Sequence, residues 1–113
     1  MKMEIADRAD GLVNVTLVGR LDTPAVERIE PEFVASLVPR GARAIVDLSQ
    51  LEFVSSMGLR MFMTVARNLA GNNDKLVLYS PQPWVNMIFT TTSLQSIISV
   101  RPDAESAAVT ARA

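Results

Sequence analysis

The chain contains neither cysteine nor histidine among its 113 residues. Without a thiol or an imidazole it lacks a thiolate nucleophile, the Ser-His pair of hydrolases, the commonest general base and the usual ligands of zinc. No disulfide can form, which favours an intracellular setting, and we expect a cytoplasmic location. These two absences exclude most of the common catalytic and metal-binding functions.

Charge and long apolar runs are also scarce. The formal net charge is -1 and the 11 basic residues are scattered, so nothing favours direct binding to nucleic acid. No apolar run approaches the roughly 20 residues that a membrane span requires, and the charged start of the chain is unlike a signal peptide. The carboxylates Asp22, Asp47 and Glu52 have no nucleophile, base or glycine-rich phosphate loop to work with. We therefore expect no enzymatic activity and no cofactor.

The chain does have enough apolar material for one folded domain. Hydrophobic residues make up 49% of the sequence, so we expect a single domain over residues 1–113. Apolar patterns predict strands near residues 3–5, 12–18, 42–48, 75–79 and 97–100, and helices near 24–38, 57–69, 84–91 and 104–113. This alternation predicts an α/β fold: a mixed, mainly parallel sheet of four to five strands, with helices packed mostly on one face.

Two details of the first helix can be predicted. Thr23 is expected to cap its N-terminus, since Pro24 suits the first helical position. Pro31 lies inside the same pattern, where proline removes a hydrogen bond and clashes with the preceding turn. We therefore expect a kink at Pro31 or a fresh helix that begins there.

Residues 47–60 form the candidate functional site. They read Asp-Leu-Ser-Gln-Leu-Glu-Phe-Val-Ser-Ser-Met-Gly-Leu-Arg and join a buried strand to a helix, with Ser55 and Ser56 at the helix entrance. A helix entrance has N–H groups without intrahelical partners and the positive end of the helix dipole. It suits a capping hydroxyl and a phosphate equally, so Ser56 is interpreted either as an N-cap or as a phosphate acceptor.

This stretch resembles the STAS domain of bacterial anti-sigma factor antagonists. The resemblance rests on D-L-S-x-L-x-F, the serine pair and G-L-R in that order, on Gly19-Arg20-Leu21-Asp22 upstream, and on the element order across nearly the whole chain. In that family the second serine of the pair is the regulatory phosphorylation site. It corresponds to Ser56, with Ser55 as the fallback. Two positions depart from the commonest form: Ser55 stands where many phosphorylated antagonists have Asp, and Met57 where a small residue is usual.

The resemblance implies a binding protein that is itself a substrate. When unphosphorylated, it would occupy an anti-sigma factor that is also a serine kinase, and the sigma factor would be freed. The kinase would use ATP to phosphorylate Ser56, and a PP2C-type phosphatase would reset the protein. The alternative on the same fold is an unphosphorylated accessory or scaffold subunit of a lipid, transport or signalling complex.

The partner-binding surface is expected around the serine pair. Asp22 is included because the end of the second strand should lie at the same sheet edge, and because the resemblance places it near the serine loop. Met57 and Met61 have a second interpretation as core-filling side chains, and Arg60 as a solvated helix residue. The predicted members are Asp22, Ser55, Ser56, Met57, Gly58, Arg60 and Met61.

Overall fold

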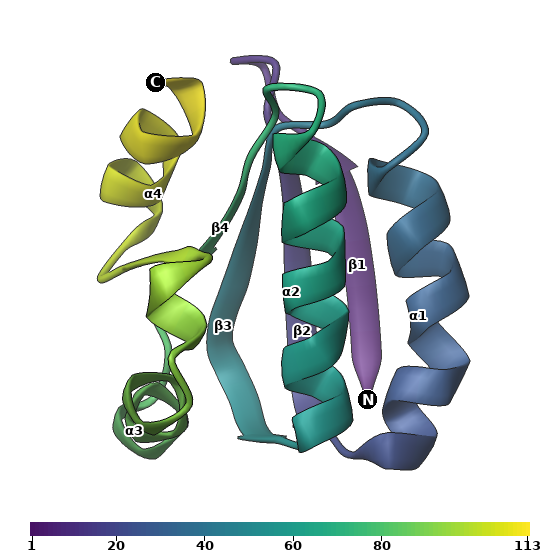
Figure 1. The fold of residues 1–113 in the computed structure, drawn as a ribbon, viewed down its shortest axis with the longest axis vertical. Coiled ribbons are helices and arrows are strands. Elements are labelled where there is room, and N and C mark those ends of the chain that lie inside the picture. Colours follow the sequence, from purple (N-terminus) through teal and green to yellow (C-terminus); the bar gives the residue numbers. More distant parts are fainter.

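A mixed five-stranded sheet runs through the middle of the molecule (Figure 1). The computed structural model describes every residue, 1–113. The strands are β1 (Lys2–Asp7), β2 (Val13–Leu21), β3 (Ala44–Val54), β4 (Leu76–Tyr79) and β5 (Ser99–Arg101). They lie in the order β1-β2-β3-β4-β5. The first pair is antiparallel and the other pairs are parallel.

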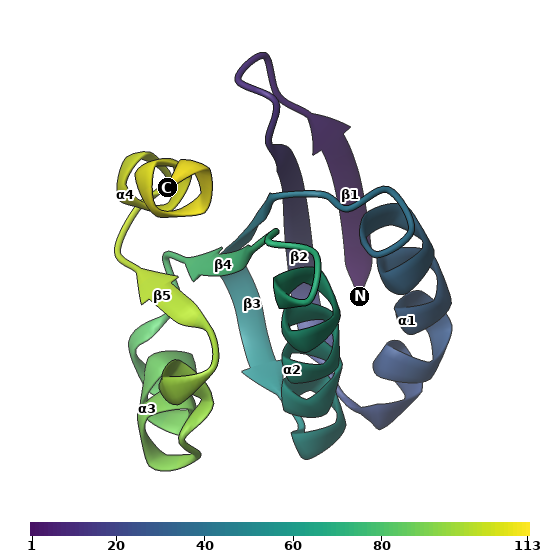
Figure 2. The same ribbon diagram turned by 45° about the horizontal axis from the view of Figure 1, so that its top comes forward.

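Four α-helices and one short 3-10 turn connect and cover the strands. They are α1 (Thr23–Leu37), α2 (Ser56–Ala70), α3 (Pro83–Thr91), the turn η1 (Leu94–Ser96) and α4 (Ala104–Arg112). The main core of 27 buried residues lies between one face of the sheet and α1, α2 and α3, whereas 7 residues form a smaller core under α4. Figure 2 shows α4 on the other side of β4 from α2. The predicted fold class is confirmed, including the placement of most helices on one face.

The two edge regions of the sheet, the β1–β2 hairpin and β5, differ in how closely they match the sequence prediction. The hairpin of β1 and β2 closes through a turn at Asp10 and Gly11, where Gly11 has a φ of +85°, a left-handed conformation that favours glycine. At the other edge, β5 begins two residues later than predicted. The N–H groups of Ile97 and Ile98 still bond to the Leu94 carbonyl of the preceding turn, each at 3.0 Å, so they are not available to the sheet.

Both the start and the middle of α1 differ from expectation. Asp22, not Thr23, is the N-cap, because its Oδ1 accepts a hydrogen bond from the Ala25 N–H at 3.0 Å. The helix continues without a break through Pro31, so the fresh helix predicted there is wrong. In an ordinary helix the carbonyl of Glu27 would accept a hydrogen bond from the N–H of residue 31, which proline lacks. Both Glu27 and Pro31 are exposed, so water can bond to that carbonyl instead.

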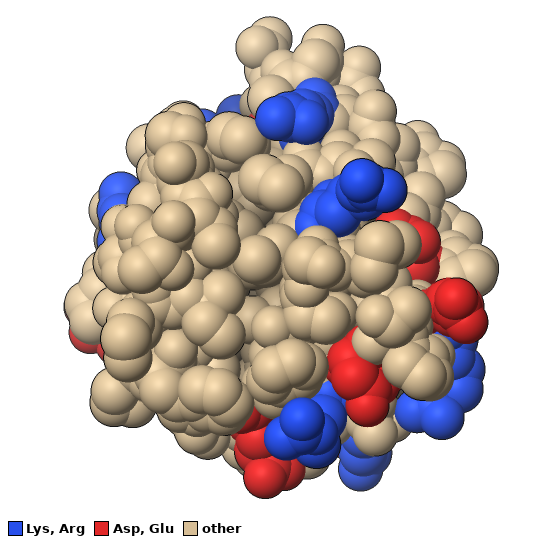
Figure 3. Space-filling model, turned by 60° about the horizontal axis from the view of Figure 1, so that its bottom comes forward, with Lys and Arg blue, Asp and Glu red and all other residues tan.

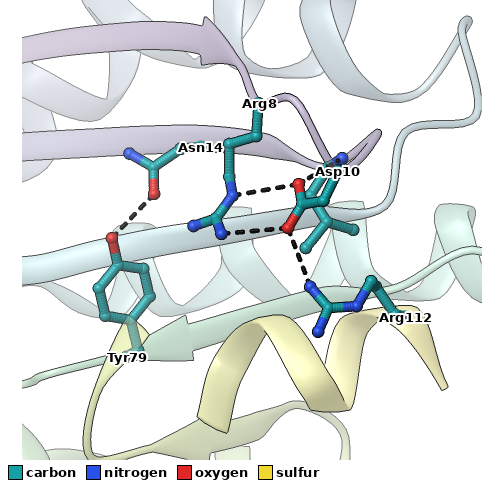
Figure 4. Close-up of polar contacts among 6 residues, drawn as sticks. Arg8, Asp10, Asn14, Tyr79 and Arg112 are labelled. Atoms are coloured by element: carbon teal, nitrogen blue, oxygen red, sulfur yellow. Dashed lines mark hydrogen bonds and ion pairs between the residues drawn. The ribbon is translucent and has the colours of Figure 1, made fainter. Parts of the chain in front are cut away.

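Polar contacts fasten α4 to the hairpin (Figure 4). The Asp10 carboxylate accepts hydrogen bonds from Arg8 at 3.0 Å and from Arg112 of α4 at 2.9 Å. The hydrogen bond from Arg8, helped by the Leu12 N–H, holds the pKa of Asp10 below its ordinary value. Because the pKa is lowered by folding, the stability that this carboxylate contributes is present above its unfolded pKa and is lost as the pH falls through the folded pKa.

A buried hydroxyl near this cluster leads to a stability prediction. The Tyr79 hydroxyl donates a hydrogen bond to Asn14 Oδ1 at 2.8 Å (Figure 4). Replacing Tyr79 by Phe is expected to lower the free energy of unfolding by about 1 kcal/mol, because the part-buried Asn14 amide loses its donor. Urea denaturation measures the change, and an unchanged midpoint would contradict it.

The same residue has a pH dependence of predictable sign. Burial, together with the negative charge of Asp47, raises the pKa of Tyr79. The stability linked to this group is therefore complete below the unfolded pKa of about 10 and is lost as the pH rises through the folded pKa. Tyr79 is the only tyrosine of the chain, so absorbance reports its ionisation directly. The stability advantage of wild type over Tyr79→Phe is expected to shrink in alkaline solution.

Candidate functional site

Two helices begin next to each other at one edge of the sheet, at the bottom of Figure 1. The parallel strands β2 and β3 end there together, with Leu21 opposite Val54, and the Ser55 N–H donates to the Leu21 carbonyl at 2.9 Å. Because α1 and α2 start directly after these strands, Asp22 and the serine pair lie at the same edge. The structure thus brings Asp22 to the place where the sequence predicted it.

The two serines have different environments. Ser55 is the N-cap of α2: its backbone is extended, and its Oγ accepts a hydrogen bond from the Gly58 N–H at 3.2 Å. Ser56 is the first helical residue and is exposed, and no hydrogen bond of its hydroxyl occurs within the chain. The interpretation of Ser56 as the N-cap is therefore wrong by one residue. The hydroxyl of Ser55 has a structural role, and that of Ser56 is available for chemistry.

The surroundings of Ser56 favour negative charge. It occupies the first turn of a 15-residue helix, where unpaired N–H groups and the positive end of the dipole lie. Arg60 is exposed and forms no ion pair. Residues four apart on a helix are neighbours, so Arg60 is within reach of a charged group on Ser56. We refer to the exposed and half-buried members of the predicted surface, Asp22, Ser55, Ser56, Met57 and Arg60, as the serine rim.

Two residues of the predicted partner surface are buried instead. Met61 is 0% exposed and packs in the main core, which makes core filling its role and places it beyond the reach of a docked protein. Gly58 is also buried, and a Cβ built on it would lie 2.9 Å from side-chain atoms of both Leu21 and Val54. These two residues are therefore corrected from partner contacts to packing positions. Met57 remains half-buried at the edge of the same core.

A stability prediction follows from the close approach at Gly58. Gly58→Ala is expected to lower the free energy of unfolding by about 1–2 kcal/mol, because overpacking a buried position outweighs the better helix propensity of alanine. Thermal unfolding measures the effect. Gly71→Ala is the matched control, since its added Cβ would meet no atom closer than 3.5 Å. Equal melting temperatures for wild type and Gly58→Ala would contradict the prediction.

A cationic and aromatic stack at the ends of the same strands was missed by sequence reasoning. Arg20 lies opposite Phe53 across β2 and β3, and its guanidinium carbon is 4.6 Å from the Phe53 ring centre. The ring of Trp84, at the start of α3, has its centre 6.2 Å from that of Phe53. Strand alternation could have revealed the first pair: Leu21 and Val54 point into the core, so the residues before them point away from it.

Charge is unevenly distributed over this end of the molecule. Figure 3 shows acidic and basic side chains gathered on one side and a broad uncharged area on the other. The uncharged side is that of α3, which has no charged residue and exposes the large apolar side chains of Trp84 and Met87. A protein that docks across this end meets an apolar area next to a charged one, a combination found in transient interfaces.

Metal binding and membrane insertion were two further possibilities for the chain. No three acidic side chains come together in a way that could hold a metal ion. None of the helices is both long and apolar enough to cross a membrane. The arrangement is suited to holding a phosphate at the start of α2 and to contacting another protein there.

Comparison with known proteins identifies close likenesses along nearly the whole chain. A protein-family model, that of the STAS domain, matches residues 3–107. BtrV of Bordetella bronchiseptica, named as an anti-sigma factor antagonist, is 32% identical over 102 residues, which cover 90% of this chain and 88% of BtrV. An anti-sigma factor antagonist from Mycobacterium paratuberculosis has a crystal structure with a TM-score of 0.88, 21% identity, and coverage of 99% and 94% of the two chains. The structure of the Bacillus cell fate determinant SpoIIAA in its phosphorylated form has a TM-score of 0.72 and 22% identity, and the match covers 96% of this chain and 98% of SpoIIAA.

Proposed function

The chain belongs to the STAS domain family, and from this premise we propose that it acts as an anti-sigma factor antagonist. In its unphosphorylated form it binds an anti-sigma factor that is a serine kinase, and the sigma factor held by that kinase is released. The observation that supports this most directly is the exposed Ser56 hydroxyl, without a hydrogen bond in the chain, at the start of α2. The name of the Bordetella relative supports the general role, and the phosphorylated SpoIIAA supports modification as its control.

The modification is a phosphoryl transfer from ATP bound to the kinase. The Ser56 Oγ attacks the γ-phosphorus, the bond to the bridging oxygen of ADP breaks, and the hydroxyl proton passes to a base of the kinase. A PP2C-type phosphatase hydrolyses the phosphate ester and restores the hydroxyl. This chain supplies the acceptor, and both catalysts are its partners.

The fold of α2 tolerates the added charge. A phosphate on Ser56 adds a charge of about -2, next to unpaired N–H groups and the positive end of the helix dipole. Arg60, one turn along the helix, can form a charge-assisted contact with the phosphate. Ser56 belongs neither to the core nor to the cap, so its modification breaks no structural contact. The domain therefore stays folded in both states.

A protein docked over the serine rim does not tolerate the same charge. A partner that covers Ser56 would have to bury a phosphate of about -2 charge, and the single positive charge of Arg60 balances only part of it, which leaves a cost of several kcal/mol. This cost is subtracted from the free energy of binding, so phosphorylation shifts the equilibrium toward the separated proteins. Phosphorylation thus acts as a release switch through the interface, without refolding the domain.

Intact-mass measurement after incubation with the cognate kinase and ATP tests this function. Wild type is expected to gain one phosphate and Ser56→Ala none. Ser55→Asn is the matched control, because Asn is an equally good N-cap but has no hydroxyl, and it is expected to gain one phosphate. Phosphate on Ser55 would contradict the assignment, and no phosphate on wild type would favour the unphosphorylated accessory or scaffold subunit.

A further inference from the structure

A polar pocket lies between α3, η1 and the ends of β4 and β5. Its volume is about 460 Å³, and the residues that line it include Ser80, Asn86, Gln95 and Arg101. No residue of the pocket belongs to the serine rim, which follows β2 and β3. In open α/β sheets ligands bind outside the carboxyl ends of parallel strands, and the pocket lies at that end of β4 and β5.

Arg101 is a fixed cation that has no acidic partner. Its Nε donates to Thr110 Oγ1 of α4 at 2.9 Å, and its Nη1 donates to the Val100 carbonyl at 3.1 Å. A guanidinium has five N–H donors, so most of them remain for another acceptor. No ion pair joins Arg101 to a carboxylate. The half-buried side chain is therefore held in place with its charge unbalanced.

The rest of the lining adds neutral donors and no negative charge. The side-chain amides of Asn86 and Gln95 form no hydrogen bond within the chain, so their N–H groups are available. No acidic residue lines the pocket, and residues 76–100 contain no charged side chain. Asp103, which follows β5, is occupied as the N-cap of α4, where it accepts from the Ser106 N–H at 2.8 Å. The pocket thus combines one unbalanced cation with several unused donors.

We propose that this pocket binds the phosphate group of a small, polar phosphate monoester. The planar fork of Arg101 fits two phosphate oxygens, and its other contacts hold that fork in one orientation. The amides of Asn86 and Gln95 suit the third oxygen or the hydroxyl groups of the ligand. A phosphate monoester fits this acid-free lining better than a carboxylate, because it offers three terminal oxygens and a charge of about -2. The pocket is of the size that small ligands occupy.

NMR titration of the full chain with glycerol 3-phosphate tests the proposal. Glycerol serves as the uncharged probe and lactate as the carboxylate probe, all at one ionic strength. The side-chain N–H resonances of Arg101, Asn86 and Gln95 are expected to shift and saturate with glycerol 3-phosphate. Glycerol is expected to shift none of them, and lactate to bind at least about tenfold more weakly.

Substitutions in the pocket decide whether it is the site. Arg101→Gln removes the cation, and Asn86→Asp adds a repelling carboxylate without breaking a side-chain hydrogen bond. Each is expected to raise the Kd for glycerol 3-phosphate by at least about tenfold. Asn68→Asp makes the same charge change at an exposed position of α2 and is expected to leave the Kd unchanged.

The result does not depend on Arg101→Gln alone, because Arg101 also holds α4 and its loss can impair folding. Asn86→Asp then provides the test. The proposal is overturned by the absence of saturable shifts with glycerol 3-phosphate, by equally tight binding of lactate, or by an unchanged Kd in Asn86→Asp. None of these measurements involves Ser56 or a kinase, so they stand apart from the proposed antagonist function.

Discussion

Replacing Ser56 by Asp is expected to weaken binding to the cognate anti-sigma kinase by at least about a hundredfold. The carboxylate places a permanent negative charge in the first turn of α2, where the helix itself tolerates it. A partner that covers this position has to bury the charge away from water, which we expect to cost about 3–5 kcal/mol, and about 1.4 kcal/mol corresponds to tenfold in Kd. Titration calorimetry with the kinase measures the Kd directly.

Two further variants separate the effect of a charge at position 56 from the loss of the hydroxyl and from a negative charge elsewhere on α2. Ser56→Ala is expected to keep most of the wild-type affinity, because it adds no charge to the surface that the partner covers. Thr64→Asp introduces the same charge at an exposed position about two turns along α2. It is expected to change the free energy of binding by no more than about 0.5 kcal/mol. Wild-type affinity in Ser56→Asp, with circular dichroism showing an intact fold, would rule out the release switch.

Truncating Met61 to alanine is expected to lower the free energy of unfolding by about 2–5 kcal/mol. The Met61 side chain is fully buried in the main core, so its loss leaves a cavity among neighbours that can collapse only in part. Met57→Ala removes a half-buried side chain from the edge of that core, and a cost of about 1 kcal/mol is expected. Urea denaturation of the two variants gives the comparison.

The same two variants separate packing from partner contact. Met57 belongs to the serine rim, so Met57→Ala is expected to weaken binding to the kinase. Met61→Ala is expected to leave the affinity of the folded fraction unchanged. If the two variants were equally stable, the assignment of Met61 to the core would be wrong.

The fold could be predicted from sequence because it depends on periodic burial. The apolar runs that became β3 and β4 are buried on both faces, as expected of parallel strands between covering helices. The 3.6-residue stripe of α2 matches the side that packs on the sheet, with Phe62, Val65 and Leu69 all fully buried. Patterns of this kind average over many residues, so errors at one position do not change the outcome.

Single-residue roles at the helix starts were predicted less well. At both α1 and α2 the capping side chain is one residue earlier than the sequence analysis placed it: Asp22 before Thr23, and Ser55 before Ser56. Two adjacent polar residues are each good caps by type, and only the backbone angles select the extended one. Met61 was placed in the partner-binding surface, with core filling as its second interpretation, and the structure buries it in the main core.

Some features that join distant elements could not be predicted from the sequence. The contact of Trp84 with Phe53 depends on where α3 begins relative to the end of β3. The pocket around Arg101 depends on Asn86 and Gln95, which belong to two further elements. No local sequence pattern predicts these contacts between elements, because each side chain taken alone resembles an ordinary surface residue.

The separate tasks of the two neighbouring serines have an evolutionary consequence. By the family resemblance, Asp is expected in many phosphorylated antagonists where this chain has Ser55, and both residue types are good N-caps. Exchanging one for the other therefore leaves the structure of α2 unchanged and alters only the charge next to Ser56. Under the proposed function, the ATP of the kinase approaches Ser56 past one carboxylate fewer when this residue is serine. If Ser56 is phosphorylated as proposed, a change at position 55 can thus alter the rate of phosphorylation while the structure of α2 stays the same.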